Sequence, residues 1–527
     1  MTYFLPGYSK YKQPSISTPS FQTSFTWLVW MAALLGVSAL LALVMFYRGP
    51  GGYFLAWLMY FLGIALILYQ PRYGIYLILG LTLVGDVVLT PWFPFVKNFS
   101  SRESVLFLND ALIFNPLETY LAATFLSWLV HSFSNRKLKI FRGPLLFPAL
   151  GFLGFVIFGF FYGIRTGGNL NIALWEARPL FYLVVMLFLV SNLLEKREHI
   201  SNLLWAAMLG IFIESIFGNW YYFVRLRGNL AGVNAITEHP AAVHMNTLIV
   251  FFLAAWLYKM SPRKRLVLSL MVPIIMIPYI ATQRRAAFIT LGIALIVIAV
   301  LLFKENRRAF WSIVPLATIV LMGYLAAFWN LSGPLALPAE AAKSVLVPSQ
   351  SSAADQASDA YRDIENFNLH FTLRQKPLTG IGFGQKFYVV IPMPDISWFQ
   401  WWQYFPHNSI IWIWLKTGAF GFAAMLYMLG ISIMVGARAL WRMPRNELSA
   451  IALTAVLYLV MHFVFAYVDI GWDSQSMLYV GAMMGLLGSL EHIVAKPTPL
   501  PAKRWRWQPD PRPIPELLPL HENTPVA

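Results

Sequence analysis

Long apolar stretches separated by short polar loops recur along almost the whole chain. Most of these stretches approach or exceed the roughly twenty residues that an α-helix needs to cross the hydrocarbon core of a bilayer. The pattern therefore predicts an all-α polytopic membrane protein with about 12–14 transmembrane helices. The predicted spans lie near residues 25–47, 53–70, 73–92, 116–133, 144–163, 179–194, 200–224, 242–259, 265–282, 286–303, 309–328, 409–437, 448–468 and 475–492.

The spacing of these spans divides the chain into five parts. The first part is polar and has no early apolar core, so no cleavable signal peptide is expected. The run at 409–437 is long enough for a short re-entrant piece followed by a span. The parts are an N-terminal segment (1–24), an N-terminal membrane bundle (25–328), a long polar loop (329–408), C-terminal membrane helices (409–492) and a basic, proline-rich tail (493–527).

Charge adds a direction to this arrangement. The net charge is +16, which could suggest nucleic-acid binding, but lysine and arginine gather in alternate loops between spans. Short basic loops stay in the cytoplasm, so we expect both termini inside and the loop 329–408 outside, in the periplasm of a bacterial inner membrane. Tryptophan and arginine alternate in Lys503–Trp507, which could stack on bases, although a lipid headgroup anchor fits a segment that follows a membrane helix better. The basic clusters lie at 136–142, 196–197, 259–265, 304–308 and 438–445.

Two further sequence features exclude classes of chemistry. The chain has no cysteine, so disulfides, thiolate metal ligands and thiol nucleophiles are absent. The turn Gly380-Ile-Gly-Phe-Gly384 follows no βαβ unit, precedes no Lys-Ser/Thr pair and faces away from cytosolic ATP, so it is not a nucleotide loop. Neither a metal nor another cofactor is predicted.

Arginine is unexpectedly frequent in the loops that should face outward. A guanidinium offers a planar fork of donors that suits phosphate oxygens, so a bound anion would explain residues that break the topological bias. The alternatives are an interfacial arginine that snorkels, for the residue that precedes the span at 179–194, or simple solvation, for the two in the glycine-containing loop. The candidates are Arg178, Arg225, Arg227, Arg284 and Arg285.

The outward loop 329–408 also carries the candidate catalyst, His407, within Phe405-Pro-His-Asn-Ser409. Asn408 can cap the following helix or orient the imidazole, and glycine at 382 and 384 can let the backbone approach a ligand. A histidine in front of a membrane helix can equally be a structural hydrogen-bond partner. Acidic residues and then Arg374 punctuate a stretch near 352–374 that predicts an amphipathic helix lying over the membrane surface.

Several of these segments, in this order, resemble the O-antigen ligase and Wzy-type polymerase superfamily of bacterial envelope enzymes. Thr282-Gln-Arg-Arg-Ala-Ala-Phe288 is similar to the family's Ser-Arg-Gly-Ala pattern, with Arg285 at the arginine, while Arg284 and Ala286 replace the serine and glycine. The resemblance covers roughly residues 140–490, and two N-terminal spans look additional to the usual twelve. The other segments are Arg227–Leu230, Glu238-His-Pro240, the turn 380–384, Pro406-His-Asn408 and Gly418-Ala-Phe-Gly421.

The resemblance implies a GT-C-like membrane enzyme that acts on an undecaprenyl-pyrophosphate-linked glycan without metal. His407, Arg285 and, less directly, Arg178 would be catalytic. The acceptor would be a saccharide or lipid A-core, and ligase and polymerase both remain open. Neutral imidazole suits a general base near neutral pH, and arginines would stabilise the departing pyrophosphate. Substrate binding would involve Arg284, Arg225, Arg227, His239, Arg374, Gly382, Gly384 and Asn408.

Three other functions remain to be separated from this one. A protein O-oligosaccharyltransferase is a sibling within the superfamily. A lipid-linked-oligosaccharide flippase or other transporter would need charges near mid-bilayer and inverted repeats, and only Asp86 and Glu214 look like mid-span carboxylates. A non-catalytic scaffold would leave the outward arginines and the Pro-His-Asn element unexplained.

Overall fold

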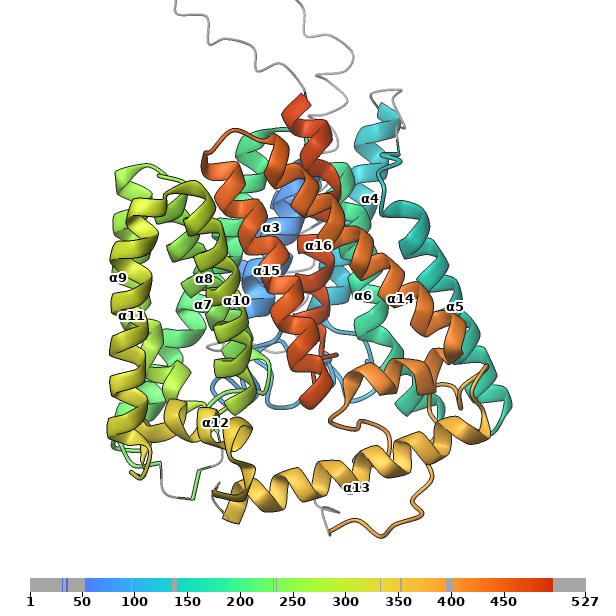
Figure 1. The fold of residues 1–527 in the computed structure, drawn as a ribbon. Coiled ribbons are helices and arrows are strands. Elements are labelled where there is room, and N and C mark those ends of the chain that lie inside the picture. The colour runs from blue at the N-terminus through green and yellow to red at the C-terminus, as the bar shows by residue number, and fades with distance from the viewer. Residues whose placement is uncertain are drawn as a thin grey trace, which may run out of the picture.

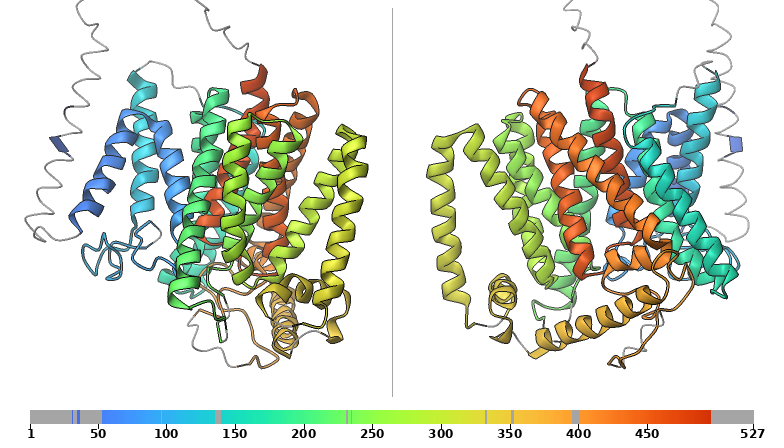
Figure 2. Two further views of the ribbon diagram at one scale, coloured as in Figure 1. Left: turned by 90° about the vertical axis from the view of Figure 1, so that its left-hand side faces the viewer. Right: turned by 45° about the vertical axis from the view of Figure 1, so that its right-hand side comes forward.

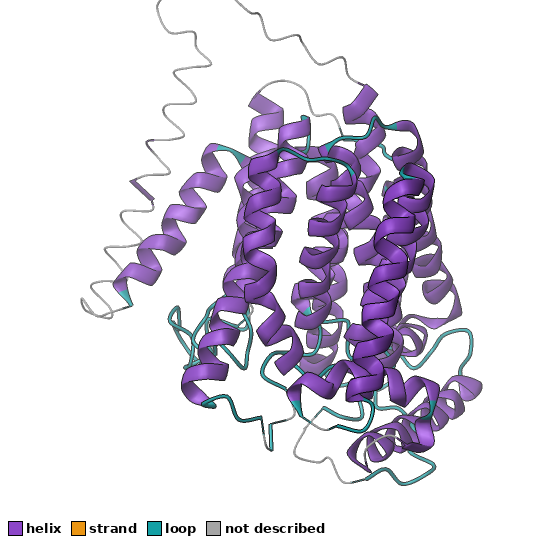
Figure 3. Cartoon of the chain, turned by 60° about the vertical axis from the view of Figure 1, so that its left-hand side comes forward, coloured by secondary structure: helices purple, strands orange, loops and turns teal. Residues whose placement is uncertain are grey.

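The computed structural model describes residues 53–495, except 96, 135–139, 231, 234, 332, 351–352 and 395–400, and in addition Met31, Leu35 and Gly36. Within this part of the chain the fold is entirely helical, without β-strands (Figures 1 and 3). The all-α expectation is thus confirmed. The predicted segment 1–24, most of the predicted span 25–47 and the tail after residue 495 lie outside the described residues.

Long helices run roughly side by side and form one bundle (Figure 2). Among the described residues, nine helices are long and apolar enough to cross a membrane, and three shorter apolar helices accompany them. The bundle helices are α2 (Phe54–Tyr69), α3 (Pro71–Val84), α4 (Pro116–Ser134), α5 (Leu146–Arg165), α6 (Leu170–Leu193), α7 (Arg197–Trp220), α8 (Ala241–Leu257), α9 (Pro262–Ala281), α10 (Arg285–Glu305), α11 (Arg307–Phe328), α14 (Ser409–Arg442), α15 (Glu447–Val468) and α16 (Ser474–Ala495).

The centre of the bundle is built on close contact between α16 and α6. A Cβ atom at Gly481 would lie 2.3 Å from the carbonyl oxygen of Leu183, and one at Gly485 would lie 2.7 Å from that of Leu187. Glycine therefore lets the two backbones touch, as small residues do between membrane helices. At the periphery, α11 is apolar but buries no residue in its most apolar stretch, which is the composition of a helix that faces lipid.

The two ends of the bundle differ in character. Lys264 forms an ion pair with Glu447, and Arg445 forms one with Glu305, so three of the basic loops meet at one end. The opposite end carries the loops predicted to face outward (Figure 1). The structure thus separates the two sets of loops as the charge pattern predicts.

The long loop 329–408 contains much of its own structure. The helix predicted near 352–374 is confirmed as α13 (Ala353–Gln375), which lies across the end of the bundle beside α12 (Leu337–Leu346) (Figures 1 and 2). After the loop, α14 is kinked at Gly418, whose φ of 74° and ψ of 177° are not helical. A short helical piece therefore precedes the long one, as the length of the run 409–437 indicated.

Two helix boundaries differ from the sequence interpretation. The helix α3 ends at Val84, where Gly85 is followed by Pro91 and Pro94, so Asp86 lies in a loop and is not a mid-span carboxylate. The helix α6 begins at Leu170, well before the predicted residue 179, because the side chain of Asn169 caps it by accepting a hydrogen bond from the Ile172 amide at 3.2 Å.

Candidate functional site

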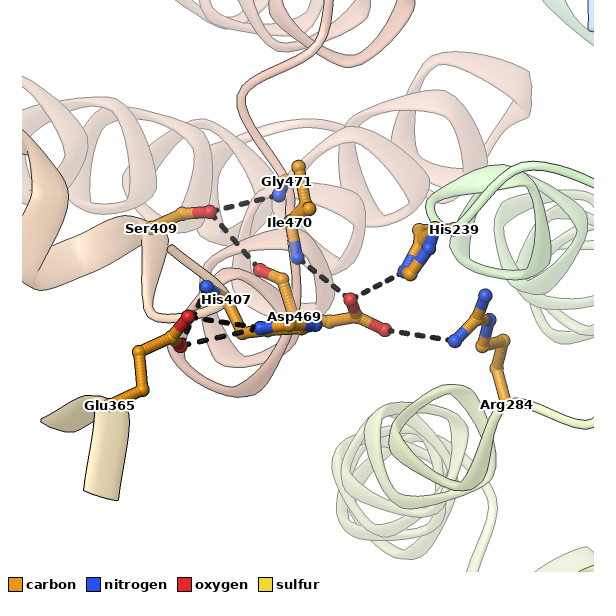
Figure 4. Close-up of polar contacts among 8 residues, drawn as sticks. All are labelled: His239, Arg284, Glu365, His407, Ser409, Asp469, Ile470 and Gly471. Atoms are coloured by element: carbon orange, nitrogen blue, oxygen red, sulfur yellow. Dashed lines mark hydrogen bonds and ion pairs between the residues drawn. The ribbon is translucent and has the colours of Figure 1, made fainter. Parts of the chain in front are cut away.

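A buried carboxylate at the end of α15 organises a cluster of polar side chains at the outward end of the bundle. Asp469 Oδ1 lies 2.6 Å from His239 Nδ1 and accepts a hydrogen bond from the Ile470 amide at 2.8 Å. Its other oxygen lies 3.8 Å from Arg284 Nη1. These three partners come from the loop before α8, the start of α16's approach and the turn before α10 (Figure 4). One carboxylate therefore joins segments that are far apart in the sequence.

The charges around Asp469 decide its ionisation. Burial alone would raise the pKa of this carboxyl group, but His239, Arg284 and His407 outweigh burial and hold the pKa well below its usual range. The carboxylate is therefore a fixed negative charge at neutral pH. It provides a counterion that holds His239 and Arg284 in place while both keep some exposure, at 36% and 20% of their side chains.

His407 is oriented by a second carboxylate, from α13. The His407 amide donates to Glu365 Oε2 at 2.9 Å, and His407 Nδ1 lies 3.3 Å from both carboxylate oxygens. Glu365 is 1% exposed, whereas the His407 side chain is 26% exposed. With Nδ1 turned to a buried carboxylate, Nε2 is the ring nitrogen that remains for a substrate.

Short contacts between loops connect the two histidine–carboxylate pairs. Ser409 Oγ donates to the Asp469 carbonyl at 3.1 Å and accepts from the Gly471 amide at 3.0 Å (Figure 4). The predicted helix cap is confirmed, because Asn408 Oδ1 accepts from the Ile411 amide at 3.1 Å. The first turn of α14 therefore fixes His407 relative to Asp469.

The two adjacent arginines predicted at the start of α10 point to different partners. Arg284 faces Asp469, whereas Arg285 Nε lies 3.2 Å from Asp355 and its Nη2 lies 3.0 Å from Asp359, both on α13. Gln283, just before them, has a φ of 57°, a left-handed conformation that ends α9 sharply. The tight turn thus presents two guanidinium groups beside the histidines.

A group of buried acids adjoins this cluster behind His239. The Glu238 amide donates to Asp86 Oδ2 at 2.7 Å, and Glu238 itself accepts from the Val87 amide at 3.2 Å. Burial, followed by Asp86 and Asp473, raises the pKa of Glu238 well above its usual value. Burial likewise raises the pKa of Asp86 and of Asp473. These acids hold the loop before α8 against the end of α3 and thereby position His239.

Arg178 has a different environment from the one expected of a pyrophosphate ligand. Its Nη1 donates to Asn98 at 3.3 Å, its Nη2 donates to the Ile113 carbonyl at 2.6 Å, and its Nε lies 3.3 Å from Glu118. The guanidinium thus ties the loop 93–115 to α4 and α6. In this structure Arg178 does not join the contacts around Asp469 and His407.

The remaining predicted residues lie outside the Asp469 cluster. Arg225 and Arg227 are exposed, and Arg225 lies over the Trp220 ring at 5.3 Å. Arg374 is exposed near the end of α13. A Cβ atom at Gly382 or Gly384 would lie 2.5 Å from backbone atoms of Gly163 or Asn169, so these glycines permit helix packing.

Sequence reasoning passed over the two carboxylates that organise the site. Glu365 was visible only as one of several acids on an amphipathic helix, because nothing in its spacing distinguishes it from a solvated residue. Asp469 ends a membrane span and is followed by Gly471 and Trp472, which was the available signal. An ionisable residue at the end of an apolar span is a functional candidate, and that criterion could have found it.

Comparison with known proteins gives one match. No curated protein matches the chain significantly. The family model described as O-antigen ligase matches residues 268–426, a segment that contains Arg284, Arg285, Glu365 and His407. This match confirms that the chain resembles the O-antigen ligase and Wzy-type polymerase superfamily, whose members are membrane glycosyltransferases.

Proposed function

We propose that this protein transfers a glycan from undecaprenyl pyrophosphate to an acceptor hydroxyl at the outward, periplasmic end of the bundle. The observation that carries the proposal is the arrangement in Figure 4, where two histidine–carboxylate pairs and an arginine converge between α8, α10, α14 and α15. All but His239 and Asp469 lie in the segment that matches the O-antigen ligase model.

His407 is the general base in this proposal. The acceptor hydroxyl transfers its proton to Nε2 of His407 as its oxygen attacks the anomeric carbon of the glycan. Glu365 holds Nδ1 and the backbone amide of His407, so the ring is oriented before the acceptor arrives. A positioned base of this kind contributes about 10²- to 10⁴-fold to a rate.

Arg284 and Arg285 bind the leaving group. The bond between the anomeric carbon and the pyrophosphate oxygen breaks as the new bond to the acceptor oxygen forms, which inverts the anomeric centre. Negative charge then grows on the pyrophosphate, and guanidinium groups fixed nearby stabilise it. His239 lies on the same side of Asp469 as Arg284 and contributes a further donor (Figure 4).

The test is transfer by purified protein in detergent, with undecaprenyl-pyrophosphate glycan and candidate saccharide or lipid A-core acceptors. Without two compartments a flippase has nothing to do, so product formation separates an enzyme from a transporter. His407→Ala should lower the rate by about 10²- to 10⁴-fold, the usual range for a general base. His370→Ala, an exposed histidine on α13, is the matched control and should leave the rate unchanged. Lipid translocation by vesicles without transfer to any acceptor would overturn the proposal.

A further inference from the structure

Two acidic residues of α13 occupy the arginine that the proposed function assigns to pyrophosphate. Asp355 lies 3.2 Å from Arg285 Nε, and Asp359 lies 3.0 Å from Arg285 Nη2. Asp359 also lies 3.2 Å from Arg362, one turn further along the helix. The guanidinium is 17% exposed, and the two carboxylates are 22% and 44% exposed. The carboxylates therefore sit where solvent, or another anion, can reach them.

The two halves of α13 are attached to the protein in different ways. The second half packs in an apolar cluster made by Leu369, Leu373, Ile381, Phe387 and Leu415. Asn368 and Thr372 add hydrogen bonds to the backbone of residues 388–391. In the first half, Glu365 is the one side chain that is fully buried among the described residues. Polar contacts, chiefly those to Arg285 and His407, therefore hold the first half on the site.

We propose that Asp355 and Asp359 act as built-in substitutes for the two phosphates of the donor, and that the donor must displace them to bind Arg285. This inference rests on the proposed function. It makes these two residues specificity determinants, because they set which anion can compete for the site. The beginning of α13 then lifts from Arg285, while its second half stays anchored.

The chemistry of the two anions supports the exchange. Each phosphate of a glycan-linked pyrophosphate carries one negative charge, as each carboxylate does, so two phosphates replace two carboxylates charge for charge. Ion pairs with partly exposed carboxylates are weak, whereas a guanidinium binds phosphate oxygens through paired, charge-assisted hydrogen bonds. A lipid monophosphate supplies only one group for two positions, and it should compete less well.

Displacement need not disturb the base. Glu365 lies four residues before Leu369, beside the anchored half of α13, and both are buried. Asp355 lies ten residues further from that anchor along the helix. A small tilt of α13 about its anchored half therefore moves Asp355 most and Glu365 least, so His407 keeps its orientation while Arg285 is released.

The experiment measures the binding of undecaprenyl pyrophosphate and undecaprenyl phosphate to purified protein in detergent. The double variant Asp355→Asn/Asp359→Asn should bind the pyrophosphate about 3- to 30-fold more tightly, the ratio that two weak ion pairs correspond to. Its preference for pyrophosphate over monophosphate should also become smaller. Asp363→Asn is the matched control, since it removes the same charge from an exposed position of the same helix and should leave both affinities unchanged.

A second measurement follows the movement of the helix. Because the chain has no cysteine, spin labels can be placed at Ala357→Cys on α13 and Ala111→Cys in the loop 93–115. Undecaprenyl pyrophosphate should lengthen this distance, while a label at Gln375→Cys, in the anchored half, should keep its distance to residue 111.

The outcomes separate this inference from the proposed function. Wild-type protein that transfers glycan, with a double variant that binds pyrophosphate no better than Asp363→Asn, would overturn the substitution by carboxylates alone. Weaker binding by the double variant would also overturn it, because the aspartates would then support the site. Failure of wild-type protein to bind the donor or form product would instead overturn the proposed function.

Discussion

Replacing Asp469 by asparagine tests whether one buried carboxylate holds the site together. Asparagine keeps the shape of the side chain but removes the charge that faces His239 and Arg284. Removing one partner from a buried ion pair destabilises a protein by about 3–5 kcal/mol. His239 and Arg284 keep partial contact with solvent, so the expected loss is smaller, about 1–3 kcal/mol. Loss of a charge-assisted hydrogen bond of that size should lower the transfer rate by about 10- to 100-fold.

The direction of the pKa shift fixes the pH range of this effect. The folded-state pKa of Asp469 is depressed, so its contribution to stability is present above the unfolded value of about 3.9 and is lost as the pH falls through the lower folded value. The carboxylate therefore contributes fully between pH 5 and pH 8. The assay is thermal unfolding in detergent at pH 7, together with the rate of glycan transfer.

Asp473 provides a matched control in the same loop. Burial raises its pKa, so its contribution is favourable at low pH and is lost as the pH rises through the folded value. Asp473→Asn should therefore be neutral or stabilising at pH 7, and asparagine still caps α16 in place of the oxygen that accepts from Ser476. Equal stability and activity of Asp469→Asn and wild-type protein would refute the organising role of Asp469.

Three other predictions concern the arginines and the topology. Arg285→Ala should abolish transfer while the protein remains folded, and Arg285→Lys should stay poor because a point charge cannot replace a fork of donors; near-normal activity of the alanine variant would remove its role at the leaving group. Arg178→Ala should lower both activity and the unfolding temperature, since its guanidinium ties three segments together, whereas Arg142→Ala at the basic end should change neither. A cysteine at Leu346, which is 70% exposed on α12, should react with an impermeant reagent from outside; labelling only after the membrane is opened would contradict the proposed orientation.

Much of the architecture was accessible from the sequence because a bilayer imposes simple rules. Apolar length predicts membrane helices, and alternating basic loops predict which loops share an end of the bundle. Within the site, the Pro-His-Asn element and the paired arginines were predicted, since each interrupts an apolar pattern. The partners of these residues were not predictable, because Asp469 is 62 residues from His407 and 185 residues from Arg284 along the chain. Only the packing of α8, α10, α14 and α15 brings them together.

The glycine turn shows how a correct motif can have a different physical reason. Gly380, Gly382 and Gly384 all have positive φ, between 66° and 83°, which side chains rarely adopt. Their missing side chains make room for protein backbone.

The turn is also held by a buried ion pair at the start of the neighbouring helices. The Gly384 amide donates to Glu176 Oε2 at 2.5 Å, and Lys416, 2.7 Å from Glu176 Oε1, donates to the Gln385 carbonyl at 2.7 Å. Breaking such a pair would leave a buried charge without its partner, so the turn has little freedom to move. Because Lys416 lies in the same short helical piece that begins after His407, fixing the turn also fixes that piece. The motif thus contributes to the site by positioning the helix that carries the base.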